Sequence, residues 1–433
     1  MKRSIKSFIE SRKGTRRRRH NRTSGSARKT SYTPRMEGLE DRALLTAISV
    51  LNTDDSGPGS LRQAIVDAAS ADDGEDVITF AKGVRGTITL TSGELSIEND
   101  LKIDGPSSGK ITISGNNSSR IFNISGAETE VSIDDLKLVR GFAEDAGGAI
   151  LHTGQSLSVT DVEFKHNQVV GNDDVLLPGN GAAGGAIAIL SPNLELEFRP
   201  TATIEDSRFS QNDAFGTNGG AFGGAFGGAI SNQGLLTIKS STLTHNGAFG
   251  GNDNNNDNED RDAFAFVGLA FGGAVNNNNG GTLIMDDCVV THNQAVAGDR
   301  NTGGSATFVG DAGGGGIENI FFSTATVTNS TIAHNTAVGG DDSISEAPIG
   351  GGGASGGGIG NRFRATLTVD DSEISHNRVI GGDRSSRSNA YGGGLHNSLG
   401  STLTVSGSEF LHNRVTGGSL ADGRLSFRSA DKR

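Results

Sequence analysis

The sequence is poor in the residues that cross-link or punctuate most globular enzymes: its 433 residues include no tryptophan, two tyrosines, seven prolines and one cysteine, Cys288. A single cysteine excludes both a disulfide framework and a cysteine-based metal site. No segment approaches 18 consecutive apolar residues, so we expect no transmembrane helix. Glycine, by contrast, numbers 66, about twice its usual share. It lies in short clusters, which predict tight turns between strands, since collagen would need glycine at every third position.

Positive charge is scarce outside a basic leader, residues 1–46. The leader holds 14 of the 38 Lys and Arg residues and 4 acidic residues, whereas the rest of the chain holds 24 basic and 46 acidic residues. The acidic body argues against nucleic-acid binding by the folded part. The leader fits an export segment, a polybasic tail for anionic polymers or a disordered tail. The short apolar stretch Ala43–Leu51 favours export, although no A-x-A cleavage triplet follows it.

Two short anchors recur along the chain. The first is a Gly-Gly-x-aliphatic step, which begins at Gly147, Gly184, Gly227, Gly272, Gly314, Gly356 and Gly392. The second is an apolar residue three places before an asparagine, as in "STIAHNTAVGGD", and it ends at Asn167, Asn212, Asn246, Asn293, Asn335, Asn377 and Asn413. From the aliphatic residue to the asparagine is 16 to 18 residues in six copies and 25 in the second, which carries an insert. This self-similarity indicates a repeat architecture.

The segments between the anchors alternate apolar and polar residues, as in Thr366–Ile374 and Thr402–Phe410. A period of two with β-branched residues predicts strands that bury one face. Each repeat therefore predicts a coil of about three short strands, which buries its apolar face only when the next coil stacks on it at about 4.8 Å. The expected fold class is all-β, a parallel β-helix of roughly nine coils whose equivalent residues stack in columns.

Stacked coils would place the repeated asparagines in one column. An Asn at a bend can pass an amide hydrogen bond to the Asn above it, which gives buried polar groups the partners that they require. With Gln211 in the seventh place, the preceding residues predict a neighbouring column of His166, His245, His292, His334, His376 and His412. Like charges so close depress one another's pKa, so we expect mainly neutral imidazoles at pH 7. A metal-binding column is the alternative, but a ligand set converges on one point whereas this column follows an axis.

The two ends of the chain differ from the repeats. We divide the chain into the leader (1–46), an N-terminal cap (47–80), the β-helix (81–420) and a C-terminal tail (421–433). The cap contains one predicted helix after the N-cap Ser60, with apolar residues at helical spacing at Leu61, Ala64, Ile65 and Ala68. Such a cap is needed because a terminal coil exposes its apolar interior and a row of unpaired backbone groups.

Variable inserts separate each asparagine from the next glycine step. Because they leave the same corner of successive coils, they must crowd one edge of the solenoid. Phenylalanines gather in two inserts or at their ends, at Phe215, Phe222, Phe226, Phe249, Phe264, Phe266 and Phe271. These rings either fold back and seal the edge or form an exposed patch that binds a partner.

Acidic residues also gather in the inserts, in the tract 251–262 and in the GGD steps Gly340–Asp341 and Gly382–Asp383. Carboxylates are typical Ca²⁺ ligands. These segments lack both the EF-hand spacing and the nonapeptide period of calcium-binding β-rolls. A solvated loop is therefore favoured over a calcium site, and we expect no other cofactor.

With these motifs, the chain resembles two groups of bacterial proteins. The GGA[IV] and FxxN anchors over about 147–413 are similar to the repeats of the polymorphic outer-membrane proteins, a family of surface β-helix passengers linked with adhesion. The segment "NTDDSGPGSLRQAI" resembles the SLREA-type N-terminal region of secreted β-helix proteins of the pectin-lyase-like class, and "LEDRALLT" resembles a LEPR-xLL-type leader. The resemblance implies a right-handed solenoid at the surface or outside of a bacterium.

Two hypotheses for function follow. The first is a non-enzymatic surface or matrix protein that binds carbohydrate or a surface protein, or mediates adhesion, through its variable edge. The second is a polysaccharide lyase or glycoside hydrolase, which would need paired acids, or Ca²⁺-binding acids with an Arg or Lys base. The pairs Asp134–Asp135, Asp286–Asp287 and Asp370–Asp371 lie at strand corners where solvated residues are expected anyway. We expect no Arg or Lys beside them on adjacent coils, and we assign no catalytic residue.

Overall fold

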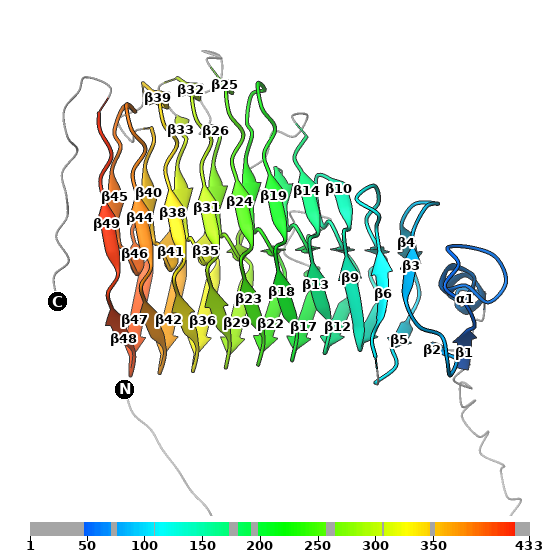
Figure 1. Ribbon diagram of the computed structural model, residues 1–433. Helices are drawn as coiled ribbons and strands as arrows, with labels where there is room; N and C mark the ends of the chain where they lie inside the picture. The colour runs from blue at the N-terminus through cyan, green and yellow to red at the C-terminus, as the bar shows by residue number, and fades with distance from the viewer. Residues whose placement is uncertain are drawn as a thin grey trace, which may run out of the picture. The chain divides into compact units, whose positions relative to one another are not determined.

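The computed structural model describes residues 47–70, 76–107, 109–172, 181–191, 198–256, 265–304, 307–346 and 351–420. By its internal contacts the chain divides into two units, Met1–Arg42 and Ala43–Arg433, and every described residue belongs to the second. The basic leader and the C-terminal tail therefore lie outside the described residues. The second unit forms a right-handed parallel β-helix, which confirms the expected fold class (Figure 1).

Four parallel sheets run along the axis of this β-helix, and a complete coil contributes one strand to each. Sheet 1 contains β1 (Ala47–Val50), β2 (Asp76–Phe80), β5 (Leu101–Asp104), β8 (Glu130–Asp134), β12 (Ser156–Thr160), β17 (Thr201–Glu205), β22 (Leu235–Lys239), β29 (Thr282–Asp286), β36 (Thr324–Thr328), β42 (Thr366–Asp370) and β47 (Thr402–Ser406). Sheet 2 contains β3 (Thr87–Thr89), β6 (Ile111–Ser114), β9 (Leu136–Val139), β13 (Glu163–Lys165), β18 (Arg208–Ser210), β23 (Thr242–Thr244), β30 (Val289–Thr291), β37 (Thr331–Ala333), β43 (Glu373–Ser375) and β48 (Glu409–Leu411).

The chain enters sheet 3 just after the repeated asparagine and sheet 4 just after the glycine step. Sheet 3 contains β10 (Phe142–Glu144), β14 (Gln168–Val170), β19 (Asp213–Phe215), β24 (Gly247–Phe249), β31 (Gln294–Val296), β38 (Thr336–Val338), β44 (Arg378–Ile380) and β49 (Arg414–Thr416). Sheet 4 contains β4 (Leu95–Ile97), β7 (Phe122–Ile124), β11 (Ile150–His152), β16 (Ile187–Ile189), β21 (Ile230–Asn232), β28 (Val275–Asn277), β35 (Ile317–Ile320), β41 (Ile359–Arg362) and β46 (Leu395–Asn397).

The inserts between sheets 3 and 4 add strands of their own. The insert sheet contains β15 (Ala182–Ala183), β20 (Ala225–Phe226), β27 (Ala270–Phe271), β34 (Ala312–Gly313), β40 (Ala354–Ser355) and β45 (Ala390–Tyr391). Farther out lie two short pairings, one of β25 (Asn255–Asn256), β32 (Thr302–Gly303) and β39 (Ile344–Ser345), the other of β26 (Ala265–Val267) and β33 (Thr307–Val309). The inserts thus stack in register like the coils that carry them.

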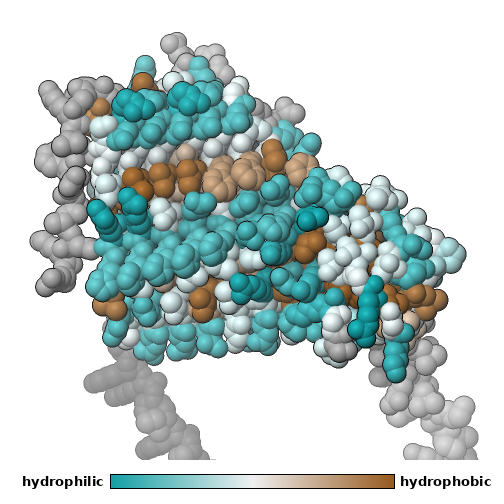
Figure 2. Space-filling view, in the orientation of Figure 1, coloured by the Kyte–Doolittle hydropathy of each residue, from teal (hydrophilic) through white to brown (hydrophobic). Residues whose placement is uncertain are grey.

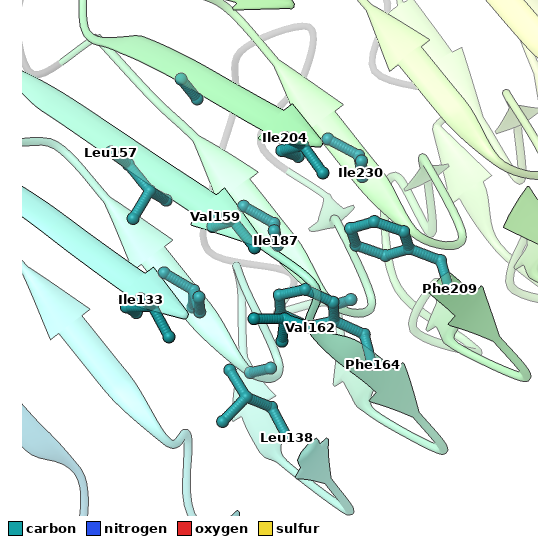
Figure 3. Close-up of a cluster of buried hydrophobic side chains, with 14 of the residues drawn as sticks. Ile133, Leu138, Leu157, Val159, Val162, Phe164, Ile187, Ile204, Phe209 and Ile230 are labelled. Carbon is teal, nitrogen blue, oxygen red and sulfur yellow. The ribbon is translucent and has the colours of Figure 1, made fainter. Parts of the chain in front are cut away.

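The interior of the solenoid is a column of aliphatic and aromatic side chains. In sheet 1, Ile204, Ile238 and Met285 follow one another in register on successive coils, and all three are buried. In sheet 2, the rings of Phe164 and Phe209 stack with centroids 4.5 Å apart (Figure 3). Fully burying one such side chain contributes about 1.5–3 kcal/mol. The alternation seen in the sequence therefore places one residue of each pair in this core.

The cap closes the end of the solenoid where β1 lies. Ser60 Oγ accepts a hydrogen bond from Gln63 N at 3.1 Å and begins helix α1 (Leu61–Ala68), whose four apolar residues are buried. Strand β1 pairs in parallel with β2. The helix contacts β1, β2 and β4, so it covers the open interior of the first coil (Figure 1). Within the described residues no helix has the length and apolar character that a membrane span requires.

The structure corrects two details of the expected coil. A complete coil has four strands and an insert strand, not about three, because the residues after each asparagine pair in register as sheet 3. Sheet 1 has eleven strands, not roughly nine, because β1 and β2 of the cap join it directly. The strands of sheet 3 and the cap strands β1 and β2 carry no clear repeat motif in the sequence. They become strands because the neighbouring coil offers them a strand to pair with.

Candidate functional site

One asparagine ladder runs along the corner between sheets 2 and 3. Asn246 Nδ2 donates to Asn293 Oδ1 of the next coil at 2.9 Å, and Asn293 Nδ2 donates both to Asn335 Oδ1 and to Leu243 O at 2.9 Å. The same bonds join Asn167, Asn212, Asn246, Asn293, Asn335, Asn377 and Asn413. An amide whose polar atoms are all bonded holds neighbouring coils in register and leaves little capacity for a ligand.

A second asparagine ladder, missed in the sequence analysis, follows sheet 4. Asn277 Nδ2 donates to Asn319 Oδ1 at 2.8 Å, and the ladder comprises Asn232, Asn277, Asn319, Asn361 and Asn397. Each of these residues lies two places after the aliphatic residue of the glycine step. That spacing was visible in the sequence and could have identified the ladder.

The histidine column lies beside the first ladder, at the surface. His245, His292, His334, His376 and His412 are exposed and stack in sequence, with ring centroids 4.8 to 5.0 Å apart. Every member of the column adopts a left-handed backbone with φ near 55°, as does Gln211. His166 occupies the equivalent corner two coils before His245 and is separated from the stack by Gln211.

The phenylalanines of the inserts fall into two groups. Phe226 and Phe271 are buried between the insert sheet and the outer face of sheet 4, where they pack with Leu269, Phe308 and Ile320. Phe266 is half-buried against the same cluster, its ring stacked on Phe308 at 5.6 Å. Phe222 is half-buried, and Phe264 lies outside the described residues. Phe226, Phe266 and Phe271 seal the inserts onto the solenoid, because packing the insert sheet on sheet 4 removes the facing surfaces of both sheets from water.

Phe215 and Phe249 lie on the outer face of sheet 3 instead. Their rings stack at 5.1 Å and are half-buried. They belong to an apolar row that crosses this face in Figure 2, formed by the last residue of successive strands: Val170, Phe215, Phe249, Val296, Val338 and Ile380. A shallow groove of about 600 Å³ lies over the two rings, and Thr217, Asn218 and Asn252 of the inserts line it.

A more enclosed cavity, here called the edge pocket, lies between the inserts and sheet 4 toward the last described coils. Its volume is about 310 Å³. Its walls include Phe308, Tyr391 and Leu399, and its polar residues are Asp311, Ser355, Arg362, Arg387, Asn389, His396 and Ser398. The rings of Tyr391 and His396 stack at 5.6 Å. Apolar walls with a few convergent polar groups are typical of small-molecule sites.

Arg362, which lines the edge pocket, belongs to a buried ion pair. Arg362 Nε donates to Glu318 Oε1 at 2.7 Å, and the two side chains are only 8% and 0% exposed. The guanidinium also lies 4.6 Å from the ring centroid of Phe271. Among the described residues, Glu318 Oε2, Arg362 Nη2 and Ser355 Oγ are buried and have no hydrogen-bond partner. Buried polar atoms are normally satisfied, so this cluster retains unused hydrogen-bonding capacity.

Two glycines make room for this pair. A Cβ on Gly360 would overlap Glu318 Oε2, and a Cβ on Gly313 would overlap Arg362 Nη2. Glu318, Gly360 and His396 occupy equivalent positions on successive strands of sheet 4. The sequence feature that could have indicated this ion pair is a charged residue, Glu318, followed one coil later by a glycine, Gly360, at the equivalent position of sheet 4.

Burial controls the ionisation of the pocket. It raises the pKa of Asp311 to about 7, although the charge of Arg362 and the N–H of Gly353, which donates to Asp311 Oδ1 at 2.8 Å, act in the opposite direction. Burial likewise raises the pKa of Glu318, against the charge of Arg362. The pKa of His396 is lowered to about 4 by burial and by Arg362, so this imidazole is neutral at pH 7. Perturbed groups in a cavity mark a candidate functional site.

The acid pairs at strand corners are not isolated from basic residues, contrary to expectation. Lys102 Nζ lies 3.0 Å from Asp134 Oδ2, and Lys239 stands directly beside Asp286 in the register of sheet 1. The expectation was wrong because the charged residues of sheet 1 face solvent, where a lysine on one coil lies within reach of an aspartate on the next. Exposed pairs of this kind contribute little energy.

The carboxylates of the GGD steps bond the backbone of the next coil. Asp341 Oδ1 accepts from Asp383 N at 2.7 Å, and Asp383 Oδ1 accepts from Ser419 N at 2.8 Å. Part of the acidic tract, residues 257–262, lies outside the described residues. Across the ranges that the structure describes, no group of three or more His, Cys, Asp or Glu side chains is placed to hold one metal ion.

Comparison with known proteins finds solved structures that are similar to this chain only at a low level. No protein-family model and no curated protein matches the sequence. Among solved structures, a surface adhesin of Streptococcus pneumoniae, PfbA, is 11% identical, with a TM-score of 0.31 over 89% of this chain and 97% of that chain. The A-module of the Azotobacter vinelandii mannuronan C-5 epimerase AlgE4 is 13% identical, with a TM-score of 0.27 over 86% and 99%.

A third structure is similar at the same low level. A mannuronic acid specific polysaccharide family 6 lyase from human gut microbiota is 8% identical, with a TM-score of 0.24 over 85% of this chain and 87% of that chain. At such identities and TM-scores, none of the three structures says what this chain binds or does.

Proposed function

We propose that this chain is an exported, non-enzymatic surface or matrix protein that binds an acidic carbohydrate in the edge pocket. The observation that carries the proposal is that Arg362 and Ser355 line the edge pocket and that Arg362 Nη2 and Ser355 Oγ are buried there without a hydrogen-bond partner. An unsatisfied buried polar group costs about 1–3 kcal/mol. A ligand that bonds these atoms offsets that cost, and this supports a binding role over a purely structural one.

The chemistry of the edge pocket suits an acidic sugar. Arg362 and Arg387 are permanent cations whose planar N–H groups match a carboxylate. Asn389 and Ser355 supply partners for hydroxyl groups. Tyr391, 46% exposed, offers an aromatic face to the apolar side of a sugar ring. A volume of about 310 Å³ lies at the lower end of the range for small-molecule sites.

The remaining parts of the proposal rest on the sequence. The basic leader and the stretch Ala43–Leu51 support export, and the similarity to polymorphic outer-membrane repeats, to the SLREA-type region and to the LEPR-xLL-type leader supports a bacterial surface location. The insert edge supports recognition because inserts vary in length while the coils beneath them keep one register.

The test is a glycan array probed with the full chain, followed by calorimetry with uronate-containing and matched neutral oligosaccharides. We expect binding to the uronates, and we expect Arg387→Gln and Tyr391→Ala to weaken it at least tenfold. Both side chains are exposed, so neither substitution removes buried packing.

The control is Phe215→Ser combined with Phe249→Ser, which removes the aromatic rings from the groove on sheet 3 and leaves the edge pocket intact. Loss of binding only in this control would place the carbohydrate in the groove. Binding to a surface protein but to no glycan would replace carbohydrate as the partner class, and an array without any bound glycan would refute the proposal.

A polysaccharide lyase or glycoside hydrolase is the second candidate, and one observation favours it. Asp311, with a pKa raised to about 7 by burial, lines the same cavity as His396 and Tyr391. A carboxyl poised near neutral pH can act as a general acid or base. Incubation with uronate polymers distinguishes the two functions: new reducing ends or unsaturated uronates that disappear in Asp311→Asn would establish catalysis.

A further inference from the structure

The histidine column has a geometry that neither the solenoid nor the proposed carbohydrate site requires. Five imidazoles follow one another without a gap, and the ring centroids of neighbours lie 5.0, 4.9, 4.8 and 4.9 Å apart. The left-handed corner that they occupy also accepts Gln211, so the backbone does not demand histidine there. Asparagine, aspartate and glycine suit such a backbone at least as well.

The ring nitrogens of the column are available. All five side chains are exposed, and among these five, as the structure describes them, only His245 has a hydrogen-bonded ring, through Nδ1 and Thr244 Oγ1 at 2.8 Å. When Nδ1–H donates in that contact, the Nε2 lone pair remains free.

The spacing suits pairs of ligands. Two imidazoles bound tetrahedrally to one Zn²⁺, each at about 2.0–2.1 Å, have nitrogens roughly 3.3 Å apart. Neighbouring rings of the column must therefore approach by roughly 1.5 Å and turn until the in-plane lone pair of each ring points at the shared ion, which exposed side chains can do by changing rotamer. The rings already differ in tilt: the interplanar angle is 4° between His245 and His292 and 42° between His376 and His412.

The geometry points to a transition-metal site: the column binds Zn²⁺ or a similar imidazole-preferring divalent ion through pairs of histidines on adjacent coils. Water completes the coordination of each ion. Since each imidazole serves one ion, five consecutive histidines provide two sites per chain. No single point with three protein ligands is needed, and the described residues contain none.

The chain itself supplies matched variants because glutamine already occupies this corner at Gln211. The double change His292→Gln and His376→Gln leaves three histidines that are not adjacent, so it should abolish both sites. His334→Gln removes the central member alone and leaves the pairs His245–His292 and His376–His412, so it should retain both. Gln211→His joins His166 to the column as a run of seven and should add a third site.

The measurement is calorimetric titration of the full chain with ZnCl₂ at pH 7.5, with MgCl₂ as the hard-cation control. The expected stoichiometries are two for the native chain, none for the double variant, two for His334→Gln and three for Gln211→His, with unchanged thermal midpoints in the absence of metal. Zn²⁺ binding that survives in the double variant, or that falls in His334→Gln as far as in the double variant, would overturn the proposal. So would a native chain that binds no Zn²⁺.

Discussion

Asn246 and Asn293, 47 positions apart in the sequence, lie on adjacent coils and are joined by a 2.9 Å bond from Nδ2 of the first to Oδ1 of the second. Asn293 Oδ1 also accepts from the backbone N of Asn246 at 2.9 Å. Both side chains are buried. One amide thus satisfies the backbone and the side chain of the coil before it, which explains why the repeat retains asparagine at this corner.

Replacing Asn293 with alanine tests the ladder. The change leaves the Nδ2 and backbone N of Asn246 without their acceptor, and each orphaned buried group costs about 1–3 kcal/mol. We therefore expect the free energy of unfolding to fall by about 2–4 kcal/mol in urea denaturation. His292→Gln, at the exposed neighbouring position, is the control and should change stability by less than about 0.5 kcal/mol. Equal effects of the two substitutions would argue against a structural role for the amide.

Replacing Gly360 with alanine tests the space that the buried ion pair needs. The added Cβ would overlap Glu318 Oε2, so the Glu318–Arg362 pair must shift. Overpacking of this kind costs about 1–3 kcal/mol, and we expect a lower thermal midpoint together with loss of ligand binding in the edge pocket. Gly304→Ala is the matched control, because a Cβ there meets no atom within 4 Å. A Gly360→Ala chain as stable as this control would show that the pair can rearrange freely.

Asp311 should make stability depend on pH. Its pKa is about 7 in the folded chain because of burial and near 3.8 when unfolded, so the folded state holds the extra proton between these values. Its contribution to stability is therefore fully present below about pH 4 and declines as the pH rises toward 7. The difference in thermal midpoint, Asp311→Asn minus the native chain, should rise from pH 4 to pH 7 and then level off. If this difference stays constant across the range, the pKa of Asp311 is not raised in the folded chain.

The two groups of phenylalanines should respond differently to truncation. Phe271 is 2% exposed and lies against the guanidinium of Arg362, so Phe271→Ala should destabilise the chain by about 3–5 kcal/mol. Phe215 is half-buried on the face of sheet 3, and Phe215→Ala should cost clearly less. Urea denaturation of both variants provides the measurement. Similar losses of stability would mean that the apolar row is packed as tightly as the layer beneath the inserts.

The asparagine ladder could be predicted from the sequence, whereas the edge pocket could not. The spacing of the Gly-Gly step and the asparagine predicted that Asn335 would lie beside Asn377, and the structure joins them at 3.0 Å. The edge pocket was not recognisable, because Glu318 and Arg362 are 44 residues apart and neither belongs to a motif. Their proximity depends on the lengths of one coil and one insert together. The local sequence could not distinguish Phe271 from Phe215 either. Both residues lie in an Ala-Phe-Gly segment, yet Phe271 is buried and Phe215 is only half-buried.

The sequence by itself determined the solenoid, its register and its two kinds of corner residue. Strand pairing between identical repeats is dictated by a local period, and any other register would turn the apolar residues outward. Only the tertiary structure decided which insert residues seal the edge and which surround a cavity. Those outcomes depend on how the non-repeating inserts pack against sheet 4. There Gly360 of one coil makes room for the carboxylate of Glu318 on the coil before it. A contact between such distant residues is not encoded by any local sequence pattern.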